Sequence, residues 1–339
     1  PVVRDPVAGT LRTASSRLTE ARKLRVQELL RTERATVEAD PDGQPILRRQ
    51  VGALSPAPEA IARAEAAGFR VLRRDSLEGL GMTLVVLEAP AGTSTRHALR
   101  KLRELDPAGT YDYNHLYLGS GGEGVDASPA SAAAPLPPVA PGSRIGLVDS
   151  GIDLGHPVLA GATVERHGCE GASFPAAHGT AVASILVGRG EGFESLMPGA
   201  TLYAADIFCG HGGGSLSLLA VELDWMAREK IAVVNISLVG AKSALLTTLV
   251  RVMTSKGFLL VAAVGNDGPA APPLYPASYP GVIGVTGVDP DRRVLPEACR
   301  GEQVDFAAAG SGFSAAAVGG AYGEIRGTSF ATPIVAGLL

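Results

Sequence analysis

The sequence has few cysteines, few aromatic residues and no long apolar segment, and these shortages exclude several classes of protein. Its three cysteines, Cys169, Cys209 and Cys299, permit one disulfide at most, and whether any two of them pair stays open. None lies in a CxxC or CxxH pair, so a structural zinc site is not expected. Apolar runs such as Gly257–Val264 are far shorter than the roughly 20 residues that a membrane span needs. We therefore expect no membrane span.

Excess charge of one sign is also absent. The formal net charge is -4 over 339 residues, with no basic stripe, which removes the electrostatic case for a nucleic-acid partner. Hydrophobic residues make up 46% and charged residues 19% of the chain, a balance typical of packed globular proteins. The length is sufficient for two domains with sizeable cores.

The first part of the chain divides into an arm, a small domain and a linker. Residues 1–45 form a charged arm, in which the apolar spacing predicts a helix from Leu18 to about Ala39. Residues 46–118 alternate strand and helix patterns and predict a small α+β domain. The expected elements are strands at Ile46–Val51, Gly68–Leu72, Gly81–Glu88 and Tyr111–Leu118, and helices at Pro58–Ala67 and Ser94–Leu105. Residues 119–142 are rich in Gly, Ala, Ser and Pro, which indicates a linker.

Residues 143–339 have a different pattern, in which short apolar strands alternate with helices. The strands are expected at Ile145–Val148, Leu202–Ile207, Ala232–Ile236, Phe258–Val264 and Val282–Val285, and the helices at Ala181–Leu186, Ser215–Arg228 and Ala244–Ser255. Near-continuous apolar strands separated by helices favour a doubly wound, mostly parallel sheet covered on both faces. In such α/β folds, the functional groups gather at the carboxyl ends of the strands.

Four polar residues lie at these strand ends and helix starts. Asp149 ends an apolar strand, His178 begins a helix of small residues, Asn266 follows another strand, and Ser329 opens a last helix. Each residue alone has an ordinary structural explanation, such as a cap or a turn. Together they are the parts that acyl transfer needs: a hydroxyl nucleophile, a base, a carboxylate that orients the base, and a donor for the oxyanion.

These motifs resemble those of the subtilisin-like serine proteases, the subtilases. The resemblance rests on Asp149–Pro157 (DSGIDLGHP), His178–Thr180 (HGT) and Gly327–Pro333 (GTSFATP), in the family's order of Asp, His and Ser. It covers about residues 143–339. It implies that Ser329 is the nucleophile, His178 the general base and acid, Asp149 its orienter and Asn266 part of the oxyanion hole.

The resemblance also implies where a peptide substrate binds. Two segments would hold an extended peptide by β-augmentation. The residues expected to bind substrate are Gly212, Gly213, Gly214, Ser215, Ser237, Leu238, Val239, Gly240, Ala263 and Gly265. Val239 stands where relatives usually have glycine, which would narrow the primary specificity pocket and favour small side chains. Asp267, next to Asn266, would instead favour a basic side chain, and both hypotheses stay open.

Residues 46–118 resemble, by pattern, the inhibitory propeptide of the same family. In this interpretation Tyr111–Leu118 threads the cleft as a product-like inhibitor, and cleavage is expected after that strand or in the linker up to Ser143. An unrelated regulatory domain is the alternative. The chain stops at Leu339, inside the helix that Ser329 opens, so we expect a carboxyl-terminal truncation of a longer protein.

The predicted function is that of a secreted or periplasmic serine endopeptidase made as a self-inhibited zymogen. Location follows from the resemblance alone, because no signal pattern precedes residue 20. The expected partners are polypeptide substrates and the chain's own propeptide-like domain. No cofactor and no catalytic metal are expected, and the family's calcium sites cannot be matched residue by residue. The alternatives are a catalytically silent, peptide-binding subtilase-like domain and an esterase that uses the same triad.

Overall fold

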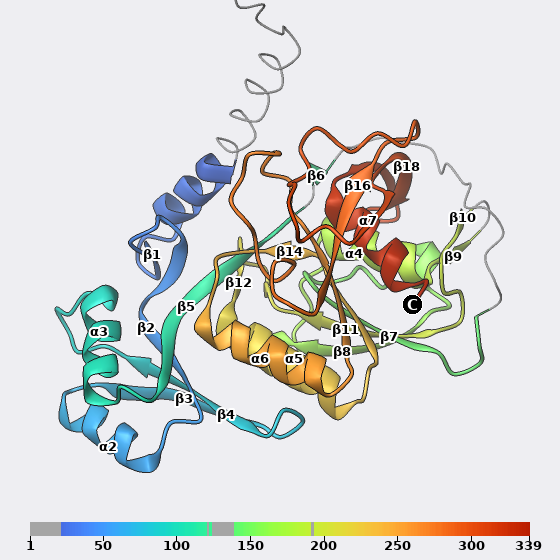
Figure 1. Cartoon of the computed structure of the whole chain (residues 1–339). Coiled ribbons are helices and arrows are strands. Elements are labelled where there is room, and N and C mark those ends of the chain that lie inside the picture. The colour runs from blue at the N-terminus through green and yellow to red at the C-terminus, as the bar shows by residue number, and fades with distance from the viewer. Residues whose placement is uncertain (1–21, 121, 124–138, 191–192) are drawn as a thin grey trace, which may run out of the picture.

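The computed structural model describes residues 22–120, 122–123, 139–190 and 193–339. An N-terminal unit, residues 22–120, packs beside a C-terminal unit, residues 139–339. Strand β5 (Thr110–Gly119) runs from the first unit into the second, as Figure 1 shows.

The N-terminal unit is an antiparallel sheet with two helices on one face. Its elements are β1 (Val37–Ala39), β2 (Pro45–Leu54), α2 (Pro58–Ala66), β3 (Arg70–Leu77), β4 (Met82–Glu88), α3 (Thr95–Leu105) and β5. The strand order is β5-β2-β4-β3, and β1 pairs with β2. Alternate residues of β2 and β4, such as Val51 and Val85, form a core with Ile61 of α2 and Leu99 of α3.

A helix over residues 22–32 precedes this sheet. The predicted helix from Leu18 to Ala39 is therefore too long at its carboxyl end, because Val37–Ala39 is strand β1, paired with β2. Pairing with a neighbouring strand satisfies the backbone here, which local apolar spacing does not reveal. The predicted start, at Leu18, lies outside the described residues.

The C-terminal unit is built on a seven-stranded sheet in the order β17-β16-β15-β13-β7-β11-β8, and each of its pairs is parallel. The strands are β7 (Arg144–Asp149), β8 (Thr163–Gly168), β11 (Thr201–Asp206), β13 (Val233–Ile236), β15 (Leu259–Ala263), β16 (Val282–Val288) and β17 (Phe306–Ala309). The helices are α4 (Ala177–Val187), α5 (Leu216–Arg228), α6 (Ala244–Ser255) and α7 (Thr328–Ala336). The expected α/β architecture is confirmed.

The two faces of this sheet carry different helices because the side chains of each strand alternate between them. Val148 faces α5 and α6, whereas Ile145 and Leu147 face α4 and α7. Short elements complete the unit: η1 (Pro157–Leu159), η2 (Cys169–Gly171), β9 (Arg189–Gly190), β10 (Phe193–Glu194), β12 (Gly214–Ser215), β14 (Leu238–Val239), β18 (Ser311–Ala316) and β19 (Tyr322–Arg326). No helix in the described part of the chain has the length and apolar character to cross a membrane.

The segment expected as a linker is partly strand at its beginning. β5 continues through Gly119, and β6 (Gly122–Glu123) pairs antiparallel with β19. The chain is therefore held by hydrogen-bonded strands on both sides of residue 121.

Candidate active site

Asp149, His178 and Ser329 meet at the carboxyl end of the central parallel strands. Asp149 is the last residue of β7, where the sheet order changes direction: β11 lies on one side and β13 on the other. Such switch points open the crevice in which doubly wound sheets bind ligands. His178 is in the first turn of α4 and Ser329 in the first turn of α7, and these helices pack on the same face of the sheet.

The three side chains form one chain of hydrogen bonds. His178 Nδ1 lies 2.7 Å from Asp149 Oδ1, and His178 Nε2 lies 2.9 Å from Ser329 Oγ. Because an ionised carboxylate only accepts, it selects the tautomer with the proton on Nδ1, which leaves Nε2 to accept the Ser329 hydroxyl proton. Asp149 and Ser329 are almost completely buried, and His178 is 9% exposed. The arrangement can move a proton from a serine hydroxyl to an imidazole.

Asn266 is held with its amide nitrogen free to donate. It lies in the loop after β15, and its Oδ1 accepts the Thr328 backbone N–H at 3.0 Å. The Thr328 hydroxyl in turn accepts the Gly265 N–H at 3.2 Å. These two bonds join the loop to the residue before Ser329. Asn266 Nδ2 is buried without a hydrogen-bond partner among the described residues, so a donor is available close to the start of α7.

The end of β5 lies between the two segments that the sequence analysis assigned to substrate. On one edge, Tyr117 pairs antiparallel with Gly214 and Leu116 with Ser215. On the other edge β5 pairs with β14, with Leu118 opposite Val239 and Gly119 opposite Leu238. An extended peptide paired on both edges is the geometry of β-augmentation.

Ser237 connects the end of β5 to Ser329 by hydrogen bonds. Its carbonyl accepts the Ser120 hydroxyl at 3.3 Å, and its own hydroxyl donates to the Ser329 carbonyl at 3.0 Å. Asn235 holds the Ser237 hydroxyl through a 2.9 Å bond. Ser120 therefore follows the paired part of β5 and hydrogen-bonds the residue whose hydroxyl donates to the Ser329 carbonyl.

The other residues expected to bind substrate lie around the same strand. Gly240 packs against the ring of Tyr117, and a Cβ at Gly213 would lie 3.0 Å from a methyl of Leu118. Gly212 lies next to the helix at residues 22–32, where a Cβ on Gly212 would lie 3.2 Å from a methyl of Leu29. Ala263 ends β15, and Gly265, with φ of 102°, has the side chains of Leu274, Cys299 and Val239 around it. Within the described part of the chain, neither Ala263 nor Gly265 forms a hydrogen bond with β5.

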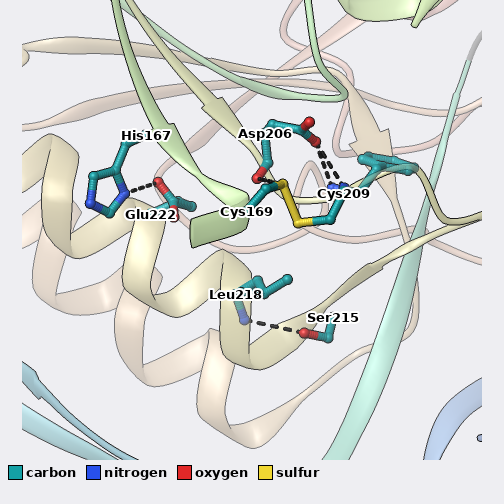
Figure 2. Close-up of a disulfide and its surroundings, with 8 residues drawn as sticks. His167, Cys169, Asp206, Cys209, Ser215, Leu218 and Glu222 are labelled. Carbon is teal, nitrogen blue, oxygen red and sulfur yellow. Dashed lines mark hydrogen bonds and ion pairs between the residues drawn. A yellow bond between two sulfur atoms is a disulfide. The ribbon is translucent and has the colours of Figure 1, made fainter. Parts of the chain in front are cut away.

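A disulfide between Cys169 and Cys209 supports the loop that carries β12. Figure 2 shows it joining the end of β8 to the turn after β11, with the Asp206 carboxylate beside it. Asp206 Oδ1 accepts the N–H groups of Phe208 and Cys209 at 2.9 and 3.1 Å. Burial raises the pKa of Asp206, and the nearby Asp149 carboxylate adds to the rise. The remaining cysteine, Cys299, is buried, and burial raises its pKa to about 12.

Sequence reasoning missed three polar residues that attach β5 to the C-terminal unit. Asp112 Oδ2 accepts the Ala244 N–H at the start of α6, at 2.6 Å. Asn114 Oδ1 accepts the Ser217 N–H at the start of α5, at 3.0 Å. Ser120 is the third. Polar residues alternating with tyrosines in a predicted strand were the available signal, but the sequence does not say which helices they reach.

The described residues contain no group of three or more His, Cys, Asp or Glu side chains arranged to hold a metal ion. A cavity of about 530 Å³ lies beside Asp149 and His178, and Gly119, Phe174 and His211 are among its lining residues. The open space at the site is therefore on the side of β5 where the strand ends.

Comparison with known proteins points in one direction. A model of the subtilase family, Peptidase_S8, matches residues 140–339. Subtilisin E from Bacillus subtilis is 30% identical over 264 residues, which are 74% of this chain and 69% of that protein. The minor extracellular protease Epr of the same species is 34% identical over 164 residues, 48% of this chain and 25% of that protein.

Among solved structures, fervidolysin from Fervidobacterium pennivorans, a keratinolytic enzyme related to subtilisin, has the same fold, with a TM-score of 0.73 at 18% identity. The match covers 89% of this chain, and this chain spans 55% of that one. The prenylagaramide maturation protease PagA is 26% identical with a TM-score of 0.54 over 59% of this chain and 74% of that one.

Proposed function

This chain belongs to the subtilase family of serine-type endopeptidases, and from that premise we propose that Ser329, His178 and Asp149 are its catalytic triad. The observation that carries the proposal is the continuous hydrogen-bond chain from Asp149 through His178 to the Ser329 hydroxyl. A hydroxyl is a weak nucleophile until a base removes its proton, and the carboxylate stabilises the imidazolium that results.

The reaction follows from this geometry. Ser329 Oγ attacks the carbonyl carbon of a peptide while its proton moves to His178 Nε2. The tetrahedral oxyanion takes hydrogen bonds from Asn266 Nδ2 and from the Ser329 N–H at the start of α7. His178 then protonates the leaving amine, which breaks the C–N bond and leaves an acyl-enzyme. Water, deprotonated by His178, releases the acyl group and restores Ser329.

We propose that the N-terminal unit is a self-inhibiting propeptide. Three observations support this. β5 pairs with β12 and β14, Asp112 and Asn114 accept N–H groups in the first turns of α6 and α5, and Ser329 is buried. The alignment with subtilisin E covers 74% of the chain, more than residues 140–339, so it reaches into this unit. A domain boundary between residues 118 and 143 fits these contacts.

The pairing also supports a processing site. Ser120 contacts Ser237 on one side of Ser329, and β6 pairs with Ile325 and Arg326, which precede Ser329, on the other. Only one residue of the chain separates these two attachments, Ser120 and Gly122. We therefore place self-cleavage between Ser120 and Gly121, within the range expected from the sequence.

The primary specificity proposed is for small side chains. Leu274, Cys299 and Val239 fill the space beside Gly265. A Cβ on Gly265 would lie 2.6, 3.3 and 3.6 Å from their nearest atoms. Asp267, the rival determinant, already has a partner in this state, the guanidinium of Arg22. A peptide library cut mainly after Ser, Ala or Gly supports this choice, and one cut mainly after Arg or Lys favours Asp267.

Export is proposed because one relative is an extracellular protease. The rival function is a catalytically silent peptide-binding domain. The complete set of Asp149, His178, Asn266 and Ser329 argues against it. An esterase is disfavoured because β12 and β14 present backbone pairing for a peptide.

A fluorophosphonate probe tests the nucleophile directly. After limited proteolysis of the N-terminal unit, we expect the wild-type chain to be labelled and Ser329→Ala to stay unlabelled. Ser255→Ala, at an exposed serine in α6, is the matched control and should label like wild type. Labelling that persists without Ser329, or a wild-type chain that never labels, would contradict the proposed enzyme.

A further inference from the structure

The helix at residues 22–32 lies across the part of β5 that occupies the cleft. Its buried residues Val26 and Leu29 form a separate apolar cluster with Leu116 and Leu118 of β5 and with Val37 of β1. Figure 1 shows the helix beside the end of β5 that enters the C-terminal unit. The strand is therefore covered by the helix where it pairs with β12 and β14.

The helix touches the C-terminal unit on both sides of that strand. Leu29 packs against Gly212, in the loop before β12. Arg22 reaches the loop after β15, where its Nε lies 3.2 Å from Asp267 Oδ2. We call residues 22–32 the strap, because they bridge the two loops that flank the bound strand.

The contact between Arg22 and Asp267 is a built site and not a surface ion pair. The two side chains are 9% and 6% exposed. Gln44 Oε1 takes a second guanidinium hydrogen bond, at 3.4 Å, from Arg22 Nη2. Removing one partner of a buried ion pair is strongly destabilising, so the strap and the loop depend on each other. Exposed pairs on the same helix, such as Arg31 with Glu28, have no such consequence.

Asp267 follows Asn266 directly, so the guanidinium is bound next to the proposed oxyanion donor. We propose that Asp267 is the centre of a guanidinium-binding site of the peptidase unit, that the zymogen fills it with its own Arg22, and that the strap so anchored holds the N-terminal unit in the cleft after cleavage. The holding role rests on the proposed function. The docking itself does not, because it needs no catalysis.

Docking is tested by hydrogen exchange on the full chain carrying Ser329→Ala, which cannot process itself if the proposal is right. We expect the amides of residues 22–32 to exchange at least 10-fold faster in Arg22→Ala than in the parent. Alanine is the better helix former, so a faster rate cannot come from lost helix propensity. Arg31→Ala is the matched control and should leave the rate unchanged. Asp267→Asn should reproduce Arg22→Ala, and the double variant should exchange no faster than either one.

Equal exchange in Arg22→Ala and Arg31→Ala overturns the docking site. A global loss of protection, seen also in α5, would mark a folding defect, and in that event Arg22→Lys and Arg22→Gln repeat the comparison with the side-chain stem kept.

Holding is tested with Ser329 intact. The time course of cleavage is followed by mass, and retention of the cleaved N-terminal fragment by size-exclusion chromatography. We expect Arg22→Ala to be cut at the wild-type rate but to lose the fragment at least 10-fold faster. Equal loss in Arg22→Ala and Arg31→Ala overturns the holding role. A wild-type chain that stays uncut also overturns it, by failure of the proposed function, while the exchange result on docking stands.

Discussion

At the scale of single residues, the site combines buried charge with fixed hydrogen-bond direction. The carboxylate of Asp149 fixes the His178 tautomer, and the Thr328 N–H fixes the Asn266 amide so that its nitrogen stays free to donate. These roles were proposed from the sequence because each residue type lies in a motif with a chemical reason for it. The contacts of Ser237 and Ser120 could not be, because they depend on how strands pair across the molecule.

Asn266→Ala should slow turnover with little change in KM, because the donor acts mainly on the oxyanion of the transition state. The expected loss in kcat is about 10²–10³, the size known for the oxyanion asparagine of a subtilisin, a relative of this chain. Steady-state kinetics on a peptide ester after removal of the N-terminal unit measures it. A variant that keeps wild-type kcat would remove Asn266 from the mechanism.

His167→Gln should lower stability in a pH-dependent way. The hydrogen bond that His167 Nδ1 donates to the Glu222 carboxylate, at 2.8 Å, raises the pKa of His167. The stabilisation by the cation is therefore complete below the unfolded value of about 6.5 and is lost as pH rises through the folded value. Since the imidazole is 38% exposed, the screened effect is roughly 0.5 kcal/mol.

Urea unfolding of the Ser329→Ala chain at pH 6 and pH 9 measures this difference, with His211→Gln on an exposed loop as the control. A destabilisation by His167→Gln that is larger at pH 9 than at pH 6 would have the wrong sign.

At the scale of elements, β5 joins the two units by pairing with strands of both. Its alternation of apolar and polar residues predicted its position closely, as did the apolar runs of β7, β13 and β15. Strands β8 and β17 were not predicted, because both are sheet edges with largely exposed side chains. An edge strand lacks the continuous apolar run that marks a buried parallel strand. The helix at residues 22–32 was expected within a charged arm, because its apolar residues lie among alternating charges, and its packing against β5 was not predicted.

Tyr117→Ala should loosen the N-terminal unit. Tyr117 is completely buried where β5 pairs with β12, and its hydroxyl donates to the Ala241 carbonyl at 3.0 Å. Removing an aromatic side chain from a packed site costs about 3–5 kcal/mol. In the Ser329→Ala background, β5 amides should therefore exchange faster. Tyr113→Ala, at a partly exposed tyrosine of the same strand, should have a smaller effect, and equal effects would place Tyr117 outside the anchoring contacts.

At the scale of the whole molecule, one antiparallel sheet contains strands of both units, since β12 and β14 join β5. The backbone hydrogen bonds at the end of β5 are therefore made with strands of the C-terminal unit. Residue patterns predicted two units and a parallel sheet, and the family resemblance implied that Tyr111–Leu118 lies in the cleft. The ion pair of Arg22 was not predicted, because it leaves no local pattern. The pairing of Cys169 with Cys209 was likewise left open by the sequence.

Reduction of that disulfide should destabilise the chain. Its two cysteines are 40 residues apart, and closing a loop of about 40 residues corresponds to roughly 4 kcal/mol on the chain-entropy model. Denaturant unfolding of the Ser329→Ala chain with and without a reductant measures the loss. The Cys169→Ser, Cys209→Ser double variant should not respond to the reductant. An equal response in both chains would assign the effect to something other than this bond.

The central claim is that Ser329 cuts the chain that covers it. Intact-mass spectrometry of the purified wild-type chain and of Ser329→Ala tests this most directly. We expect the wild type to yield a fragment that ends at Ser120 together with its complement, and the variant to keep its full mass. Two intact chains, or the same cut in both, would contradict a self-processing serine protease.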